Sequence, residues 1–290
     1  MDTEKCRLLL QVIDAGSLSA AAVRLGYTPS GVLRAVNSIE RALGFAVLRR
    51  STRGVTLTKE GELLLPKLRE FVHWGRQVEE TGAQICGLEI GELAVGTYFS
   101  VAANWLPPVI RSFQETYPHV RIHLEEGGNK DLYRWLEERR IQCCIATYRP
   151  FKGDWLALRQ DEMVLWLPPN HREAKKKAVS LTALKEDTFI NTLPDLDTDT
   201  DNLLRKVQSP MEPRFTSVDN YTTYRMVEAG LGFGINNRLM TASWHGKVAV
   251  RSFDPPQYIT LGVAVPSLEE ASPVTKTFIN YLKSGVADGL

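Results

Sequence analysis

Several features that would place this chain in a particular class of protein are scarce or missing. The 290 residues include four cysteines (Cys6, Cys86, Cys143 and Cys144) with no C-x-x-C spacing and no pair of histidines nearby, which favours reduced thiols over a structural zinc. No apolar run approaches the length of a bilayer span, and the first residues are charged rather than patterned like a signal peptide. We therefore expect a cytoplasmic protein that does not contact a membrane.

The sequence motifs of common catalytic sites are also missing. There is no G-x-S-x-G, no G-x-x-x-x-G-K-[ST], no H-E-x-x-H, and no G-x-G-x-x-G that follows a strand and opens a helix. The glycine-rich run 230–234 follows a predicted helix and enters a predicted strand, which is the wrong order for binding a phosphate group. The five histidines are scattered: His73, His119, His123, His171 and His245. We expect no catalytic site, no metal site and no cofactor.

The net charge of +1 is small, but it is unevenly distributed. Residues 1–60 contain nine Lys or Arg and five Asp or Glu, a net charge of +4, whereas the rest of the chain carries −3. A basic head on a slightly acidic body is typical of a protein that binds nucleic acid at one end. Most basic clusters are simply solvated surface, so the interpretation depends on the local pattern.

That pattern predicts three short helices in the head. Apolar residues recur at helical spacing in three stretches, which end at Gly16, Gly26 and Gly44. Ser17 is suited to cap the second helix and Thr28 the third, with Pro29 at the first helical position, where its missing N–H has no consequence. Two short helices separated by a glycine turn form a helix-turn-helix, whose second helix can enter the major groove of DNA.

The next segment predicts a basic hairpin, or wing. Short apolar stretches at 47–48 and 55–57 flank the run Arg49-Arg50-Ser51-Thr52-Arg53-Gly54. The arginines of such a hairpin can neutralise DNA phosphates.

In register across this region, the sequence resembles the DNA-binding domain of LysR-type transcriptional regulators. The matching runs are Ala15 to Ala22, Leu25 to Thr28, Ile39-Glu40 with Leu43-Gly44, and Arg50 through Gly54-Val55 to Leu57-Thr58 and Gly61. The resemblance implies that the helix from Thr28 reads the groove, with Ser30 and Arg34 at positions that usually contact DNA. It implies these DNA contacts: Thr28, Pro29, Ser30, Leu33, Arg34, Asn37, Arg49, Arg50 and Arg53.

Two of these positions depart from the family pattern. Pro29 stands where a polar residue is common, and Leu33 where a serine is common. Both changes remove hydrogen-bond donors from the expected reading face, so the operator sequence cannot be carried over. Leu33 either meets a thymine methyl group or belongs to the core of the three helices, and the sequence leaves both alternatives open.

Residues 59–87 predict one long helix, with Thr58 as its cap. Positions at alternating four- and three-residue steps form a coiled-coil-like seam: Leu64, Leu68, Phe71, Gly75, Val78, Gly82 and Ile85. The alternative is an amphipathic helix that lies on its own domain. We favour the seam, because Gly87 and Gly91 then release the chain into a new domain. In LysR-type proteins the equivalent helix pairs two subunits, which implies a homodimer, or a homotetramer built as a dimer of dimers.

From Gly91 onward, short strands alternate with helices, which predicts an α/β body with a parallel sheet. Runs similar to those of LysR-type effector domains are 106–108, 117–120, 126–127, 167–171 and 229–234. The resemblance implies two Rossmann-like lobes joined by two crossing strands, as in type II periplasmic binding proteins. We place lobe I at about 91–162 and 266–290, and lobe II at about 163–265.

The cleft between the lobes is the expected site of a small-molecule effector. A helix N-terminus offers unpaired N–H groups and partial positive charge, which suits a carboxylate. Ser100 and Asn129 begin two expected helices and serve either as caps alone or also as ligand contacts. The expected contacts are Tyr98, Phe99, Ser100, Val101, Asn129, Thr147, Thr192 and Thr198.

Two departures concern the chemistry of that effector. Tyr98 replaces a small residue, and would narrow the cleft or stack on an aromatic ligand. The run 195–201 has four alternating aspartates, which would repel an anion and could favour an amine or a divalent cation. It lacks the glycine and the distal glutamate of an EF-hand. We favour a solvated acidic loop that ends in a helix cap.

The sequence thus predicts an all-α winged helix-turn-helix head (1–58), a linker and dimerisation helix (59–87), and a two-lobed α/β effector domain (88–290). The expected function is a sequence-specific DNA-binding regulator controlled by an effector of unknown identity. A solute-binding protein is an alternative for the body alone, and the basic head argues against it.

Overall fold

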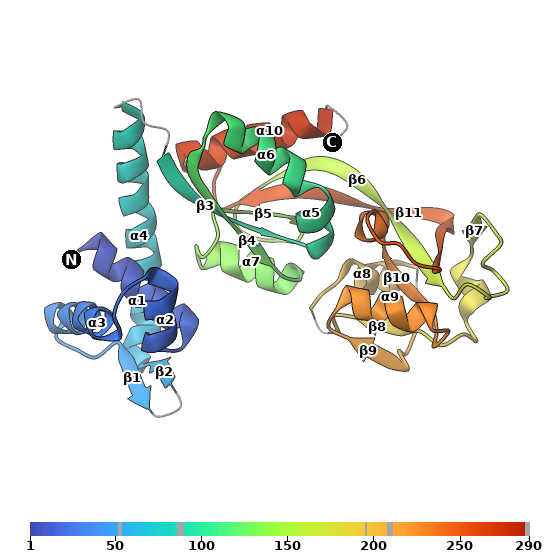
Figure 1. Ribbon diagram of the computed structural model, residues 1–290, viewed down its shortest axis with the longest axis horizontal. Helices are drawn as coiled ribbons and strands as arrows, with labels where there is room; N and C mark the ends of the chain where they lie inside the picture. Colours follow the sequence, from blue (N-terminus) through green and yellow to red (C-terminus); the bar gives the residue numbers. More distant parts are fainter. Residues whose placement is uncertain (52–53, 86–89, 195, 208–210, 288–290) are drawn as a thin grey trace. The chain divides into compact units, whose positions relative to one another are not determined.

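The structure is a computed structural model that describes residues 1–51, 54–85, 90–194, 196–207 and 211–287 (Figure 1). It divides into two compact units, Met1–Leu88 with Glu138–Arg140, and Glu89–Glu137 with Ile141–Leu290. Over the described ranges, none of the helices combines the length and the apolar character that crossing a membrane requires.

The first unit contains the predicted helices and hairpin (Figure 1). In chain order its elements are α1 (Thr3–Ala15), α2 (Leu18–Leu25), α3 (Pro29–Leu43), β1 (Leu48–Ser51), β2 (Gly54–Leu57) and α4 (Lys59–Ile85). β1 and β2 form an antiparallel hairpin in which Leu48 pairs with Leu57. A helix-turn-helix followed by a two-stranded wing is therefore present, as the sequence predicts.

Local caps explain why the three short helices begin and end where they do. They end at glycines with φ angles of 60°, 68° and 82°, a left-handed conformation that a side chain would strain. The Ser17 hydroxyl accepts a hydrogen bond from the N–H of Ala20 at 3.3 Å, and the Thr28 hydroxyl accepts one from Gly31 at 3.1 Å. Both predicted N-caps are confirmed.

The first half of the long helix α4 packs against the other elements of the head. Leu64, Leu68 and Phe71 pack into the core of the head. Val78 and Ile85, farther along, are 72% and 83% exposed. The two halves of the expected seam therefore differ. The first half packs on its own domain, as in the alternative interpretation, whereas the apolar side chains of the second half are exposed and accessible to a partner helix.

Gly75 has a packing role that the sequence did not reveal. A Cβ atom at this position would lie 2.6 Å from Cγ2 of Thr3. The glycine therefore allows the first turn of α1 to approach α4 closely, and its low helix propensity is offset by this contact.

The second unit is built on one mixed sheet of order β10-β6-β11-β5-β3-β4, with β7 on β11. β3 (Ile90–Thr97) pairs in parallel with β4 (His119–Glu126) and with β5 (Cys143–Thr147). Figure 1 shows α6 (Leu106–Thr116) and α10 (Pro273–Ala287) on one face of these strands, and α7 (Asn129–Glu137) on the other. The short helix α5 (Phe99–Asn104) follows β3 directly. This parallel part confirms the predicted α/β pattern.

Two long antiparallel strands continue the sheet into the second lobe: β6 (Asp154–Leu167) and β11 (Ala249–Val265). The first part of β6 and the last part of β11 pair inside lobe I, where Leu261, Val263 and Val265 belong to the core. The other ends pair inside lobe II, where Met163 and Leu165 are core residues. The return crossing thus lies within β11, earlier than the expected change of lobe at 265.

Lobe II holds a smaller set of elements: β7 (Ala178–Val179), β8 (Ile190–Thr192), α8 (Asp199–Lys206), β9 (Phe215–Ser217), α9 (Asn220–Glu228) and β10 (Gly234–Asn237). β8 and β9 pair in parallel, and β10 pairs antiparallel with β6. The segments Leu181–Leu184 and Arg238–Thr241 are 3₁₀ turns, here called η1 and η2.

Candidate DNA-binding surface and effector cavity

Helix α3 buries one side and exposes the other. Val32, Val36 and Ile39 are buried in the core of the head, as the predicted apolar stripe requires. Around the start of the same helix the expected DNA contacts are exposed: Thr28, Pro29, Ser30 and Arg34. The first turn of α3 therefore presents hydroxyl and guanidinium groups to the outside, where a groove of DNA can reach them.

Leu33 is half-buried, yet it does not belong to the hydrophobic core of the head. This placement favours the alternative in which Leu33 lies at the edge of the reading face. An apolar side chain there is suited to a thymine methyl group.

The wing is attached to α3 through Glu40. One carboxylate oxygen, Oε1, accepts hydrogen bonds from the N–H groups of Val47 at 2.8 Å and Leu48 at 3.0 Å. The other, Oε2, accepts from the guanidinium of Arg50 at 3.1 Å. Arg50 also donates to Oδ1 of Asn37 at 2.7 Å. A single side chain thus fixes the start of β1 and holds an arginine of the wing.

These contacts refine the roles of the expected residues. Asn37 and Arg50 are brought together, so Asn37 orients Arg50 from the side of α3. Arg49 is exposed, and its guanidinium has no partner within the described part of the chain. Arg53 lies outside the described residues. Sequence reasoning missed Glu40 as an anchor, although Glu40 belonged to one of the matching runs.

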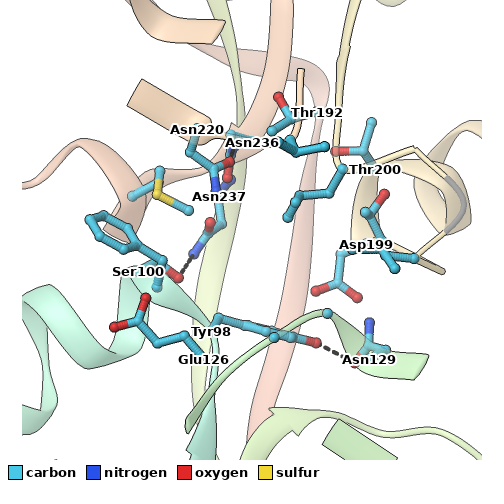
Figure 2. A pocket seen from close by; sticks show the side chains of 18 of the residues that line it. Tyr98, Ser100, Glu126, Asn129, Thr192, Asp199, Thr200, Asn220, Asn236 and Asn237 are labelled. Atoms are coloured by element: carbon cyan, nitrogen blue, oxygen red, sulfur yellow. Dashed lines mark hydrogen bonds between the residues drawn. The ribbon is translucent and has the colours of Figure 1, made fainter. Parts of the chain in front are cut away.

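A cavity of about 350 Å³ lies between lobe I and lobe II of the second unit (Figure 2). Lobe I contributes the turns that precede α5 and α7, and lobe II contributes the starts of α8 and α9 and the end of β10. Six of the expected effector contacts line this cavity: Tyr98, Phe99, Ser100, Asn129, Thr192 and Thr198.

Two expected contacts lie elsewhere. Val101 is fully buried in the hydrophobic core of lobe I, so our expectation that it contacts a ligand is wrong. α5 begins at Phe99, and two residues later the helical turn directs the side chain inward. Thr147 does not line the cavity; its hydroxyl lies 3.0 Å from that of Tyr98. It acts on the cavity through Tyr98.

Tyr98 lies across one side of the cavity and is held at its hydroxyl end (Figure 2). The hydroxyl donates to Oδ1 of Asn129 and accepts from the backbone N–H of Thr147 at 3.1 Å. Burial, and then the negative charge of Asp199, raise the pKa of Tyr98 well above its usual value. The hydroxyl therefore stays protonated and tied to lobe I, as a rigid wall of the cavity.

A second hydrogen-bonded group joins Ser100 to lobe II. Nδ2 of Asn237 lies 3.2 Å from the Ser100 hydroxyl and 2.5 Å from Oδ2 of Asp161. Burial raises the pKa of Asp161, while the hydrogen bonds from Asn237 and from the N–H of Leu239 oppose that rise. Figure 2 shows Ser100 and Asn237 pointing toward each other at the edge of the cavity.

The described part of the acidic run 195–201, which extends into the first turn of α8, is not simply solvated, and this corrects the interpretation that we favoured. Thr198 caps α8 in a capping box with Asp201, so the helix begins three residues before Asn202, where we expected it to begin. Asp197 and Asp199, however, bind Arg149 of lobe I, at 2.6 Å and 3.2 Å. Asp199 also accepts from the Thr147 hydroxyl at 2.7 Å, and the carbonyl of Asp197 accepts from Asn129 at 2.8 Å. Asp195 lies outside the described residues.

We call Thr147, Arg149, Asp197 and Asp199 the lobe latch. Burial tends to lower the pKa of Arg149, but its hydrogen bond to Asp197 and the charge of Asp199 raise it above its usual value. Arg149 is therefore permanently charged, and it links the two lobes beside the cavity. Sequence reasoning missed it because its partners lie far along the chain.

Comparison with known families decides the assignment. Residues 3–62 match the family described as bacterial regulatory helix-turn-helix protein, lysR family. Residues 87–287 match the LysR substrate binding domain. The chain belongs to the LysR family. This LysR-type protein is a DNA-binding transcriptional regulator whose effector domain binds small molecules, and its family is one of regulators rather than enzymes.

Relatives of this LysR-type regulator extend over nearly its whole length. YvbU of Bacillus subtilis, an uncharacterized HTH-type transcriptional regulator, is 28% identical over 286 residues, which cover 98% of each chain. The HTH-type transcriptional regulator TtuA of Agrobacterium vitis is 26% identical over 257 residues, 86% of this chain and 83% of TtuA.

Solved structures share the fold of this LysR-type regulator. Full-length OxyR C199D from Pseudomonas aeruginosa matches with a TM-score of 0.72 and 19% identity, covering 99% of this chain and 94% of that one. Full-length CbnR in complex with its target DNA matches with a TM-score of 0.68 and 18% identity, covering 98% and 100%. At these identities the likeness carries the fold alone, and it confirms the predicted fold class.

Cys143 and Cys144 of the LysR-type regulator are expected to resist alkylation while it is folded. Cys6, Cys143 and Cys144 are free and buried. Burial raises the pKa of Cys143 to about 12, and raises that of Cys144 as well. At pH 8 only about 10⁻⁴ of the Cys143 thiols would then be thiolate. Peptide mapping after iodoacetamide treatment should find both unlabelled until denaturant is added; fast labelling of native protein would contradict this placement.

Proposed function

We propose that this regulator reads operator DNA with the exposed start of α3, supported by the wing, and is controlled by an effector bound in the cavity between its lobes. The observation that carries the DNA half is the orientation of α3, whose apolar residues are buried while Ser30 and Arg34 are exposed. The placement of Arg49 and Arg50 on β1 beside this helix supports it. Because its target is DNA, the protein works in the cytoplasm.

The contacts divide by role. Ser30 and Arg34 lie near the start of α3 and are placed to reach base edges, since a guanidinium can bind O6 and N7 of guanine together. Arg49 and Arg50 lie on the wing, where a cationic side chain meets phosphates regardless of sequence. Among the described residues the guanidinium of Arg34 donates only to the backbone carbonyl of Ser30, at 3.3 Å, and it can leave that bond for a base.

We propose that two copies pair through α4. Exposed apolar side chains lie on this helix at Leu63, Val78 and Ile85, which are 82%, 72% and 83% exposed. A helix with such side chains is stabilised when a second helix covers them. One head reads too few base pairs for a specific site, whereas two heads in a fixed relation can read a pseudo-palindrome. The resulting state is a homodimer, or a tetramer formed from two dimers.

The cavity is placed to couple ligand and lobe position. It is lined by both lobes, and the lobe latch joins them beside it. A ligand that binds one arrangement of the lobes better than another shifts the population toward that arrangement. We propose that this shift changes how the paired heads meet the DNA, and so changes transcription.

The first test is the substitution Arg34→Ala. If Arg34 reads a base, operator affinity should fall by about 1–3 kcal/mol, roughly five- to 150-fold, with little change in melting temperature. Fluorescence anisotropy with an operator selected from random DNA by the full-length protein gives the binding isotherm. Arg111→Ala removes the same charge from an exposed site on α6 and is the control. Equal affinities of the two variants would contradict the assignment of α3.

A salt titration tests the role of the wing. The logarithm of the operator affinity should decrease linearly with the logarithm of the salt concentration, with a slope set by the number of phosphates neutralised. Arg49→Ala should make that slope shallower by about one, which is the contribution of a single neutralised phosphate, while the preference for the operator sequence is kept. A slope near zero in the wild-type protein would remove the electrostatic part of the proposal.

A further inference from the structure

The cavity between the lobes is acidic. Its described lining residues include four carboxylates and no Lys, Arg or His: the acids are Glu126, Asp131, Asp199 and Asp219. A carboxylate ligand in this cavity would therefore have no cationic side chain against it. It would also meet negative charge on both lobes, since Glu126 and Asp131 belong to lobe I and the other two to lobe II.

Two of the helix starts around the cavity, those of α8 and α9, are already capped by the chain's own side chains, whereas α5 begins at the cavity without a side-chain cap. Asp219 caps α9 and accepts a hydrogen bond from the N–H of Thr222 at 2.6 Å. Thr198 and Asp201 form a capping box at the start of α8. Asp131 stands in the first turn of α7. At α8 and α9 these side chains take up N–H groups that an anionic ligand would need, and at α7 the carboxylate of Asp131 offsets the positive end of the helix dipole.

Within the described ranges, two of the four carboxylates form an ion pair with an arginine and two do not. Asp131 pairs with Arg134 at 2.6 Å, and Asp199 pairs with Arg149 at 3.2 Å. The carboxylate of Asp219 accepts the capping hydrogen bond of α9 and forms no ion pair with any residue that the structure describes. Glu126, the last residue of β4, is exposed, and within the described part of the chain its carboxylate has no partner. Uncompensated negative charge therefore faces the cavity.

An aromatic surface lies next to Glu126. Figure 2 shows Glu126 at the backbone end of Tyr98, with its carboxylate on the side of Ser100, and Asn129 at the hydroxyl end; Glu126 and Tyr98 both line the cavity. The hydroxyl of Tyr98 is used by Asn129 and Thr147, and its side chain packs partly against the core of lobe I while the rest lines the cavity, where a ligand can contact it. Because that hydroxyl stays protonated, Tyr98 adds no charge of its own. A carboxylate beside an aromatic ring face is the combination that attracts an organic cation.

A metal ion does not fit as well. In the described ranges no group of three or more His, Cys, Asp or Glu side chains is placed to hold one. The four lining carboxylates are spread over two lobes, and two of them are already engaged with arginines. At about 350 Å³ the cavity has the size of a small-molecule site.

We infer that the effector of this regulator carries a positively charged nitrogen, as an organic amine does, and that this group binds between the carboxylate of Glu126 and the ring of Tyr98. The inference rests on the proposed function of the cavity as the effector site. It specifies the chemistry of the ligand: an ammonium group at one end, and a body that fits among Met163, Leu196 and Ile235 of lobe II.

The test uses full-length protein and matched probes. Calorimetric titrations compare a panel of primary amines, aliphatic and aromatic, with the alcohol and the carboxylate of each carbon skeleton. Amines should bind, and their neutral and anionic counterparts should bind more weakly or not at all. Glu126→Gln should weaken amine binding about tenfold or more, because it removes a charge-assisted contact. Glu125→Gln changes the same charge one residue earlier on β4, outside the lining, and should leave amine binding unchanged.

A third variant separates the two levels of the proposal. Val218 is 78% exposed and lines the cavity, so Val218→Trp can fill the cavity without disturbing a core. Carboxylates that bind better than amines, and that Val218→Trp excludes, would overturn the inferred charge while leaving the cavity as the effector site. Equal amine affinities for Glu126→Gln and the wild type would also overturn it. Amine binding that Val218→Trp does not change would contradict the effector cavity itself, and no binding by any amine would overturn the inference.

Discussion

Glu40→Ala is expected to weaken operator binding about tenfold or more, and to lower the free energy of unfolding of the head by about 2–4 kcal/mol. The carboxylate accepts from two backbone N–H groups at the start of β1 and from Arg50. Without it, both N–H groups lose their partner, and the wing is no longer fixed to α3. The direction of the change in operator affinity is informative. Removing a negative charge from the head should by itself strengthen its attraction to DNA, so weaker binding would report the displaced wing.

The measurement combines thermal unfolding with operator anisotropy. Glu40→Gln keeps an acceptor oxygen and should lie between the wild type and Glu40→Ala. Glu62→Ala removes the same charge from an exposed site in the first turn of α4, and should change both quantities little. Tighter operator binding by Glu40→Ala would contradict the prediction, because it would show that the net charge of the head affects operator affinity more than the position of the wing does.

Arg149→Met is expected to release the lobe latch. Its guanidinium binds Asp197 at 2.6 Å, Asp199 at 3.2 Å and the Thr147 hydroxyl at 2.8 Å. The side chains of Arg149 and Asp199 are only 19% and 14% exposed, so the loss leaves partly buried carboxylates without a counter-charge. We expect the free energy of unfolding to fall by about 2 kcal/mol, which is less than the cost of breaking a fully buried ion pair because these side chains are partly exposed. This loss should lower the melting temperature by about 5 °C.

Small-angle scattering of the same variant should show a wider distribution of lobe positions. Methionine keeps most of the length of the side chain, so the effect reports the ion pairs rather than a cavity. Arg134→Met is the matched control, because Arg134 pairs within α7 with Asp131 and is exposed. If both variants unfold at the same temperature and scatter alike, the latch does not hold the lobes together.

The head could be predicted almost to the residue because its signals are local. Ser17 and Thr28 cap helices within three residues of themselves, and Gly16 and Gly26 end helices by their own backbone conformation. Such features are determined by neighbours in the sequence. Glu40 was missed as an anchor because its partners lie across a turn, and only the folded chain brings them together.

The body could be predicted in outline but not in its connections. The parallel strands β3, β4 and β5 follow a repeating strand–helix pattern that is readable locally. The first half of β6 pairs with the end of β11, about a hundred residues later, and no local signal marks such a pairing. For the same reason we interpreted the acidic run 195–201 as a solvated loop, although its partner in the folded chain is Arg149 of lobe I.

Site residues were found where a strand-to-helix turn identified them. Tyr98, Ser100 and Asn129 stand at such turns and line the cavity. The prediction that Val101 contacts a ligand was wrong because Val101 lies one residue farther into α5, where the helix directs its side chain into the core. Glu126 was part of a matching run, but its place beside Tyr98 depends on the parallel pairing of β3 with β4.

Site-directed cleavage of DNA tests the central claim most directly. An iron chelate attached to the first turn of α3 through Ser30→Cys, with unsubstituted protein as the background control, cuts DNA wherever that turn lies. The account predicts cuts inside the selected operator at two symmetric positions, separated by one helical turn or a multiple of it. Cleavage spread evenly along the duplex, or no cleavage at all while the protein remains bound, would contradict the assignment of α3 as the reading helix.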